Sequence, residues 1–278
     1  IIWSNYQVAL SGPSKEFGDA TGIDLKKIQD ISTFEIPQRA MAEALSKSPE
    51  FDIFHVDSNM IPSLASAGLL EPLDQYLENA GVKINAVGNF GEFMTYKGKT
   101  YGVPTDGNVH VQFIRKDLFE DPDERKAFAD KHGREMTWPE TWEEELELMN
   151  FFTRPEDNLW GSANLRDRGS SLAWWYMYLY SAGGFPFTDD LEPNIDNDAG
   201  EYAVQTFLNV KSASHPEAAG WGTPQMIPRI INGNAFSCQY WDGIIALAEN
   251  PDKSKTAGKW SYGPVPGSKF SGKLIKRS

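Results

Sequence analysis

The chain has 278 residues, 40% of them hydrophobic, which is enough for one large domain or two α/β lobes of ordinary size. Its net charge of −13 and the lack of a Lys/Arg-rich run argue against nucleic acid and anionic membranes as partners. A single cysteine, Cys238, excludes a disulfide framework and a multi-thiolate zinc site. No stretch has the length of a membrane-spanning helix. The first residues do not form a signal peptide, so we expect any export signal to have been removed.

Aromatic residues are numerous, at 13% of the chain. There are nine tryptophans, and all but Trp3 lie after residue 137. A protein core takes up most aromatic side chains, but this excess suggests a second use. We expect some of these rings to stack on a ligand.

Short apolar segments alternate with helical patterns in the first 58 residues. The expected strands are residues 1–3, 23–28 and 51–56, and the expected helices are one that ends at Thr21-Gly22 and one over residues 35–48. This alternation predicts a mainly parallel sheet covered on both faces. Ligands collect at the carboxyl ends of strands in such sheets. The polar and loop residues that follow the strands are therefore expected on one rim: Asn5, Thr33, Phe34, Asp57 and Ser58.

The stretch over residues 97–116 is the predicted crossing between two lobes. Gly98 marks a tight turn, residues 101–104 and 109–115 are expected strands, and residues 105–108 form the loop between them. Asp106 would lie at this crossing, and we expect two lobes to close on something held near it. The alternative is that Asp106 is a turn residue that bonds its own backbone.

The remaining chain alternates helices and strands. The first expected helix covers residues 121–132, and the next three begin at a capping box at Thr141, at the caps Ser170-Ser171 and at Asn197-Asp198. The segment 225–231 follows, and Pro228 either interrupts or opens it. The last expected helix covers residues 244–248. The expected strands are residues 235–239 and 261–265. Residues 273–278 begin another apolar element, so we expect the sequence to continue beyond them.

Motifs for enzymes, cofactors and metals are missing. The chain has no Gly-x-Ser-x-Gly elbow and no Gly-x-Gly-x-x-Gly fingerprint, and Gly98-Lys99-Thr100 lacks the earlier glycine of a phosphate-binding loop. The four histidines have no metal-binding spacing. We expect no catalytic residue, no cofactor and no metal. The sequence does not exclude a glycosidase that uses two carboxylates.

Several segments, in their order and spacing, resemble the extracellular solute-binding proteins of ABC importers, in the large sugar-binding branch. The segments that carry the resemblance are residues 17, 21–23, 51–54, 68–74, 96–104, 113–119, 141–142, 183–184, 232–235 and 262–267. The resemblance implies an α/β, two-lobed periplasmic-binding-protein fold with a hinge and a central ligand cleft. It implies an N-terminal lobe that begins with residues 1–107, a C-terminal lobe over residues 108–265, and a return crossing that starts at residues 266–278. Family members continue further, with an aromatic binding residue that this chain does not show.

The resemblance also implies binding residues. Asp57 after the third strand, Asp106 at the hinge and Trp241 after the strand that follows Asn232-Gly233 match the cleft positions best. The family varies more at the other candidates, which are Asn5, Thr33, Phe34, Arg166, Trp175, Trp221 and Asp242. Carboxylates, amides and guanidinium groups hydrogen-bond sugar hydroxyls, while aromatic rings cover the apolar face of a sugar.

Each candidate also has a purely structural interpretation. Asp57 can cap a helix that starts near Met60, and Asp242 can be the N-cap of the short helix after it. A tryptophan such as Trp241 or Trp175 is by default a core residue. Arg166 can form a surface pair with Asp167.

The function that the resemblance implies is a monomeric receptor, periplasmic or extracellular, with or without a lipid anchor. It would capture a small carbohydrate, polyol or sugar derivative between two lobes and deliver it to the permease of an ABC transporter. The alternatives are a glycoside-processing enzyme with two cleft carboxylates and a sensory binding module without a transport role.

Overall fold

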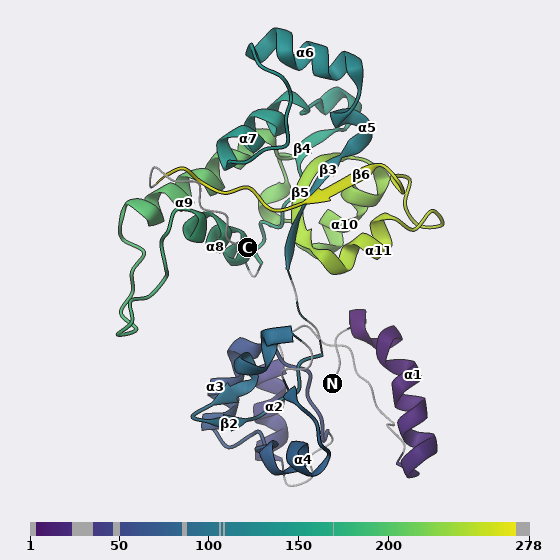
Figure 1. Cartoon of the computed structure of the whole chain (residues 1–278), viewed down its shortest axis with the longest axis vertical. Coiled ribbons are helices and arrows are strands. Elements are labelled where there is room, and N and C mark those ends of the chain that lie inside the picture. The colour runs from purple at the N-terminus through teal and green to yellow at the C-terminus, as the bar shows by residue number, and fades with distance from the viewer. Residues whose placement is uncertain are drawn as a thin grey trace. The chain divides into compact units, whose positions relative to one another are not determined.

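The computed structural model of the chain describes residues 4–23, 36–46, 51–84, 88–105, 107, 109–168 and 170–270 (Figure 1). The chain divides into two compact units, Ile1–Gly107 and Asn108–Ser278. Helices and sheets occur together in the described residues, so the fold is of the mixed α/β class.

The described part of the first unit is mainly helical. Its elements are α1 (Ser4–Thr21), α2 (Ile36–Leu45), η2 (Ser58–Met60), α3 (Ile61–Ser66), α4 (Asp74–Asn79), η4 (Gly88–Met94), β1 (Thr95–Tyr96) and β2 (Lys99–Thr100). Helix α3 buries Ile61 and Leu64. Gly22, with a φ of 73°, follows α1 as the predicted C-terminal glycine.

The strands β1 and β2 form an antiparallel hairpin around Lys97 and Gly98. Both turn residues have positive φ angles, 48° and 74°, as a two-residue hairpin turn of the right twist requires. The predicted turn at Gly98 is therefore confirmed. The prediction of a strand over residues 101–104 is wrong, because the pairing of β1 with β2 ends at Thr100. Beyond it, only the N–H of Tyr101 bonds back to this hairpin's side of the chain, to the Met94 carbonyl at 2.9 Å.

Two further predictions for this unit are wrong. Ser4 and Asn5 open helix α1 instead of ending a strand, since a polar Ser-Asn pair suits a helix start as well as a strand edge. Residues 51–56 form no strand, because they have no ladder partner among the described residues. Among the described residues of this unit, the β1–β2 hairpin is the sheet. The strand predicted at residues 23–28 lies outside the described residues, except for Ile23.

The second unit is built on a four-stranded sheet. Its strands are β3 (His110–Arg115), β4 (Trp160–Ser162), β5 (Ala235–Trp241) and β6 (Trp260–Gly263), in the order β4-β5-β3-β6. Strand β3 is antiparallel to β5 and to β6, and β4 is parallel to β5. The register pairs His110 with Trp241 and Gln112 with Gln239, so residues far apart in the sequence lie side by side.

Helices cover both faces of this sheet. Figure 1 shows α7 (Trp142–Phe151), α8 (Ser171–Ser181) and α9 (Asp198–Asn209) on one side of the strands, and α10 (Thr223–Asn232) and α11 (Ile245–Ala248) on the other. The short α5 (Lys116–Phe119) and α6 (Pro122–His132) follow β3. The core includes Phe113, Trp174 and Tyr178, all at most 1% exposed.

Local capping signals set the helix ends in this unit. Asp121 accepts from the N–H groups of Asp123 and Glu124, Thr141 forms the predicted capping box with Glu144, and the Asn197 side chain caps α9. These helix starts were predicted and are confirmed. Pro228 neither opens nor interrupts α10, which begins at Thr223 and continues past the proline to Asn232.

Strand β4 lies so close to α7 that only glycine fits at position 161. A Cβ atom on Gly161 would come within 1.9 Å of the Met149 carbonyl oxygen, which is backbone and cannot rotate away. We predict that Gly161→Ala lowers the free energy of unfolding by about 3 kcal/mol. Gly220→Ala is the matched control, because a Cβ there meets nothing within 4 Å. Urea unfolding of both variants measures the effect, and equal stability of the two would contradict the prediction.

Candidate functional site

The candidate site is an aromatic cluster at one end of the second unit's sheet. Because β3 begins at His110 and β5 ends at its register partner Trp241, the two rings lie side by side with their centroids 4.7 Å apart. Trp174 comes from α8 and meets both rings edge to face, at 5.4 Å from His110 and 5.6 Å from Trp241. Tyr240 packs against Trp241 at 5.1 Å. We call these four residues and Asp242 the His110 cluster.

Exposure differs sharply within the His110 cluster. Trp174 is fully buried and Tyr240 is 7% exposed, whereas His110 and Trp241 are half-buried. The buried tryptophan therefore supports the half-buried one from behind. Trp241 stays partly exposed at the end of the strand, and a stacking platform requires such an incompletely covered aromatic residue.

The imidazole of His110 is neutral at physiological pH. Burial lowers its pKa from 6.5 to about 4, because the charged form is poorly solvated there. Its Nε2 atom is buried and has no hydrogen-bond partner among the described residues, and the same holds for Nε1 of Trp174. The rings of the cluster thus combine apolar surface with the uncharged nitrogen atoms of His110 and Trp174.

Asp242 supplies the carboxylate of the cluster. Its N–H donates to the Val109 carbonyl at 3.2 Å, which ties the end of β5 to the residue before β3. The half-buried carboxylate makes no hydrogen bond within the described part of the chain. The N-cap of the 3₁₀ turn η8 (Asp242–Ile244) is Trp241 and that of α11 is Ile244, so the N-cap interpretation of Asp242 is wrong.

The sequence singled out Trp175, but its neighbour Trp174 is the residue that contacts Trp241. Trp175 is half-buried and packs against Tyr176 with a centroid distance of 5.4 Å. Its Nε1 atom is buried without a partner among the described residues. Adjacent residues on a helix point about 100° apart, and the sequence does not show which of two tryptophans faces the sheet. A ligand contact of Trp175 stays a prediction.

Arg166 and Trp221 have structural partners. Nη2 of Arg166 donates to the Phe207 carbonyl at 2.9 Å, and the guanidinium group lies 4.2 Å from the centre of the Phe207 ring. Burial lowers the pKa of Arg166. Trp221 is 5% exposed and lies between His215, at 4.9 Å, and Arg229, at 4.4 Å. Ligand contacts of Arg166 and Trp221 stay predictions.

In the first unit, Asp57 occupies the N-cap position of η2 but makes no capping bond with its side chain. The capping interpretation of its carboxylate is therefore wrong. Burial raises the pKa of Asp57, and the nearby charge of His55 opposes this rise. The half-buried carboxylate remains a candidate ligand group.

Three predicted residues, Thr33, Phe34 and Asp106, lie outside the described residues, and so does the side chain of Asn5.

Across the described ranges, no group of three or more His, Cys, Asp or Glu side chains could hold a metal ion. A separate search of the helices in these ranges found none with the length and apolar character needed to cross a membrane.

Sequence reasoning missed His110 and Trp174. The signal for His110 was present, because the alternation of Val109, Val111 and Phe113 places His110 on the opposite face of β3. Its closeness to Trp241 depends on the pairing of β3 with β5, which a single sequence does not reveal.

Comparison with models of known protein families identifies the family of this chain. Residues 4–273 match the profile of bacterial extracellular solute-binding proteins. The chain belongs to this family. The match covers nearly the whole sequence, so both compact units are parts of the family's fold.

Solved structures of solute-binding proteins share this fold. The Agrobacterium radiobacter K84 protein in complex with ribitol matches with a TM-score of 0.82 at 19% identity, over 98% of this chain and 66% of that protein. The Agrobacterium vitis S4 protein with bound D-mannitol has a TM-score of 0.74 at 19% identity, over 94% of this chain and 61% of its own. Maltose-bound MalE3 of T. maritima has a TM-score of 0.77 at 20% identity, over 96% and 66%.

A curated relative is the probable amino-acid ABC transporter periplasmic-binding protein y4oP of Sinorhizobium fredii. It is 23% identical over 273 residues, which are 93% of this chain and 58% of the relative. The chain therefore spans less than two thirds of the length of the relatives it matches.

The buried imidazole makes stability depend on pH. Between about pH 6.5 and pH 4 the unfolded chain binds a proton at His110 that the folded chain does not, so stability falls as the pH drops through this window. We predict that acidification from pH 7.5 to 4.5 costs the wild type on the order of 2 kcal/mol more than it costs His110→Gln. Urea unfolding at the two pH values measures this difference. Equal losses in the two proteins would refute it.

Proposed function

We propose that this chain is the ligand-binding part of an ABC importer's receptor and that it captures a small neutral carbohydrate or polyol. The observation that carries the proposal is the accessible ring of Trp241, supported by Trp174 and followed directly by the carboxylate of Asp242. An indole face suits the apolar C–H surface of a sugar or polyol, and a carboxylate accepts hydrogen bonds from its hydroxyl groups.

The charges of the His110 cluster favour a neutral ligand over an amino acid. An amino acid needs a cation for its carboxylate, and the cluster contains none, because the pKa of His110 is lowered to about 4. Arg166 already binds Phe207, and Arg229 already covers Trp221. The ribitol, D-mannitol and maltose complexes of the similar structures support the same choice, although the curated relative is described as a probable amino-acid binder.

The cluster offers no support for catalysis. A glycosidase needs two carboxylates on either side of the scissile bond, and the His110 cluster supplies one, Asp242. We propose a binding role without catalytic residues, which the family match supports. We also propose Asp57 of the first unit as a ligand contact, because its carboxylate is half-buried and caps no helix.

The setting of the protein follows from its family. Family membership supports export to the periplasm or cell exterior, and the proposed partner is the permease of an ABC transporter. We propose that the receptor acts as a monomer. A sensory binding module would share the ligand but would not be needed for its uptake, so growth of a deletion strain on that ligand separates the two roles.

We predict that polyols and small sugars stabilise the full-length protein against heat. A thermal-shift screen with ribitol, D-mannitol, maltose and tagatose tests this, with the amino acids as the matched second panel. We expect at least one polyol or sugar to raise the melting temperature by several degrees and no amino acid to do so. Stabilisation by amino acids alone, or turnover of a glycoside, would overturn the proposed function.

Trp241 provides the most direct test of the site. We predict that Trp241→Leu weakens the binding of the ligand found in the screen by about tenfold or more, because the stacking surface is lost. Trp160→Leu is the matched control, since Trp160 is also half-buried but packs against His215 at 5.1 Å. Isothermal titration calorimetry of both variants measures the change. Equal affinities would remove Trp241 from the site.

A further inference from the structure

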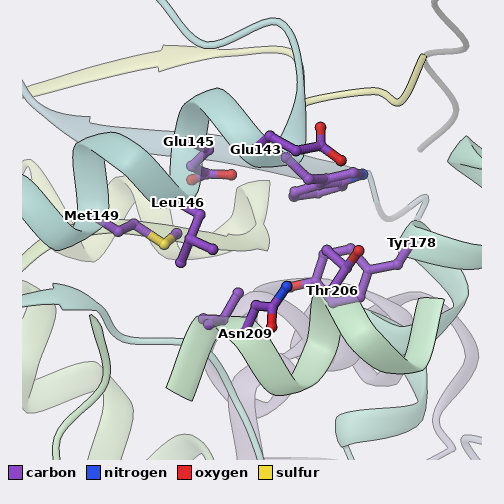
Figure 2. Close-up of a pocket in the computed structure, with 9 residues that line it drawn as sticks. Glu143, Glu145, Leu146, Met149, Tyr178, Thr206 and Asn209 are labelled. Carbon is purple, nitrogen blue, oxygen red and sulfur yellow. The ribbon is translucent and has the colours of Figure 1, made fainter. Parts of the chain in front are cut away.

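A small cavity lies between α7 and α9, close to the face of the sheet that carries Gln112 and Gln239. Its volume is about 30 Å³, which is room for water and too little for a sugar. Figure 2 shows the residues that line it, which are Trp142, Glu143, Glu145, Leu146, Met149, Tyr178, Thr206, Asn209 and Val210.

Glu145 is the group in this cavity that lacks a partner. The residue is 1% exposed, and its Oε1 atom accepts three hydrogen bonds. The donors are Nε2 of Gln112 at 2.5 Å, Oγ of Ser237 at 2.7 Å and Nε2 of Gln239 at 2.6 Å. The other oxygen, Oε2, is buried and has no partner among the described residues. A buried carboxylate oxygen without a hydrogen bond is costly, so this atom points to a missing ligand.

Tyr178 is the second cavity group with an unused polar atom. It is 1% exposed, and no hydrogen bond of its hydroxyl is found in the described part of the chain. Burial raises its pKa, so the hydroxyl keeps its proton and can donate it. Thr206 lines the same cavity from α9 and can serve as a third polar group.

The remaining polar groups of the wall already have partners. Nε1 of Trp142 donates to Oγ of Ser181 at 2.9 Å, and Oε1 of Glu143 accepts from the Tyr202 hydroxyl at 2.8 Å. Oδ1 of Asn209 accepts from Nε2 of Gln205 at 2.7 Å. Glu145 and Tyr178 are therefore the groups in this wall with a polar atom that still lacks a hydrogen-bond partner among the described residues.

We propose that this cavity binds a single water molecule, which donates a hydrogen bond to Oε2 of Glu145 and accepts one from the Tyr178 hydroxyl. The volume of the cavity admits water, the buried Oε2 atom of Glu145 has no partner among the described residues, and Tyr178 lines the same cavity. This site does not depend on the proposed function, because it requires no carbohydrate.

The water site has a positioning role beneath the His110 cluster. Gln112 and Gln239, which bind Glu145, are register partners and lie two residues from His110 and Trp241 on the same strands and the same face. Fixing the carboxylate of Glu145 therefore fixes the two amides that follow His110 and precede Trp241 on this face of the sheet.

The pKa of Glu145 depends on whether the water is bound. Burial raises the pKa of Glu145 to about 7, and the three bonds to Oε1 oppose this rise. The other titratable groups near it are Glu143 on its own helix, Tyr178 on α8, Tyr202 on α9 and Cys238 on β5. A water that donates to Oε2 stabilises the ionised form, so its loss should raise the pKa further.

A high-resolution crystal structure of the full-length protein at pH 8 tests the proposal directly. We expect density for one water within hydrogen-bonding distance of Oε2 of Glu145 and of the Tyr178 hydroxyl. In a parallel carbon-13 NMR titration, with the Glu145 signal identified by its loss in Glu145→Gln, we expect Tyr178→Phe to raise the midpoint by about one pH unit. Tyr180→Phe is the matched control on the same helix, because Tyr180 stacks on Tyr176 and does not line the cavity.

Three results would overturn the proposal. They are a dry cavity in the crystal structure, equal midpoints in the wild type and Tyr178→Phe, and an anomalous signal in the cavity after a rubidium soak, which would identify a cation in place of water. The proposed function fails separately, if no carbohydrate or polyol binds the wild type.

Discussion

The antiparallel pairing of β3 with β5 is the constraint on which the rest of the second unit depends. This ladder places His110 opposite Trp241 and Gln112 opposite Gln239, although more than 120 residues separate the members of each pair. A shift of the register by one residue would turn these side chains to the other face of the sheet. The accessible ring of Trp241 and the carboxylate that follows it are consequences of this one alignment.

Beneath the aromatic pair, the same face of the sheet is polar and buried. Gln112, Gln239 and Glu145 bond one another, and Asn164 joins them through Gln239 at 2.7 Å. Such a network is favourable only when its members are satisfied, and it then fixes one arrangement of its side chains. The sheet therefore carries a polar, hydrogen-bonded layer on the face of His110 and Trp241, while apolar residues such as Phe113 and Cys238 fill the opposite face.

The sequence predicted those parts of the fold that local chemistry decides. Asp121, Thr141 and Asn197 mark helix starts through bonds to neighbouring backbone groups, and these starts lie where they were expected. Predictions failed where long-range partners decide, as for the strand at residues 51–56. In the candidate site, Trp241 and Asp242 were named, but His110 and Trp174 join them only through strand pairing and helix orientation. Neither the strand pairing nor the helix orientation can be predicted from the spacing of residues in the sequence.

The neutral imidazole beside Trp241 determines how the charge around the two rings depends on pH. His110 gains a charge only near or below about pH 4, because burial disfavours its charged form. Burial thus keeps the imidazole beside Trp241 uncharged in neutral and in mildly acidic surroundings, so the pair of rings keeps the same charge as the medium acidifies.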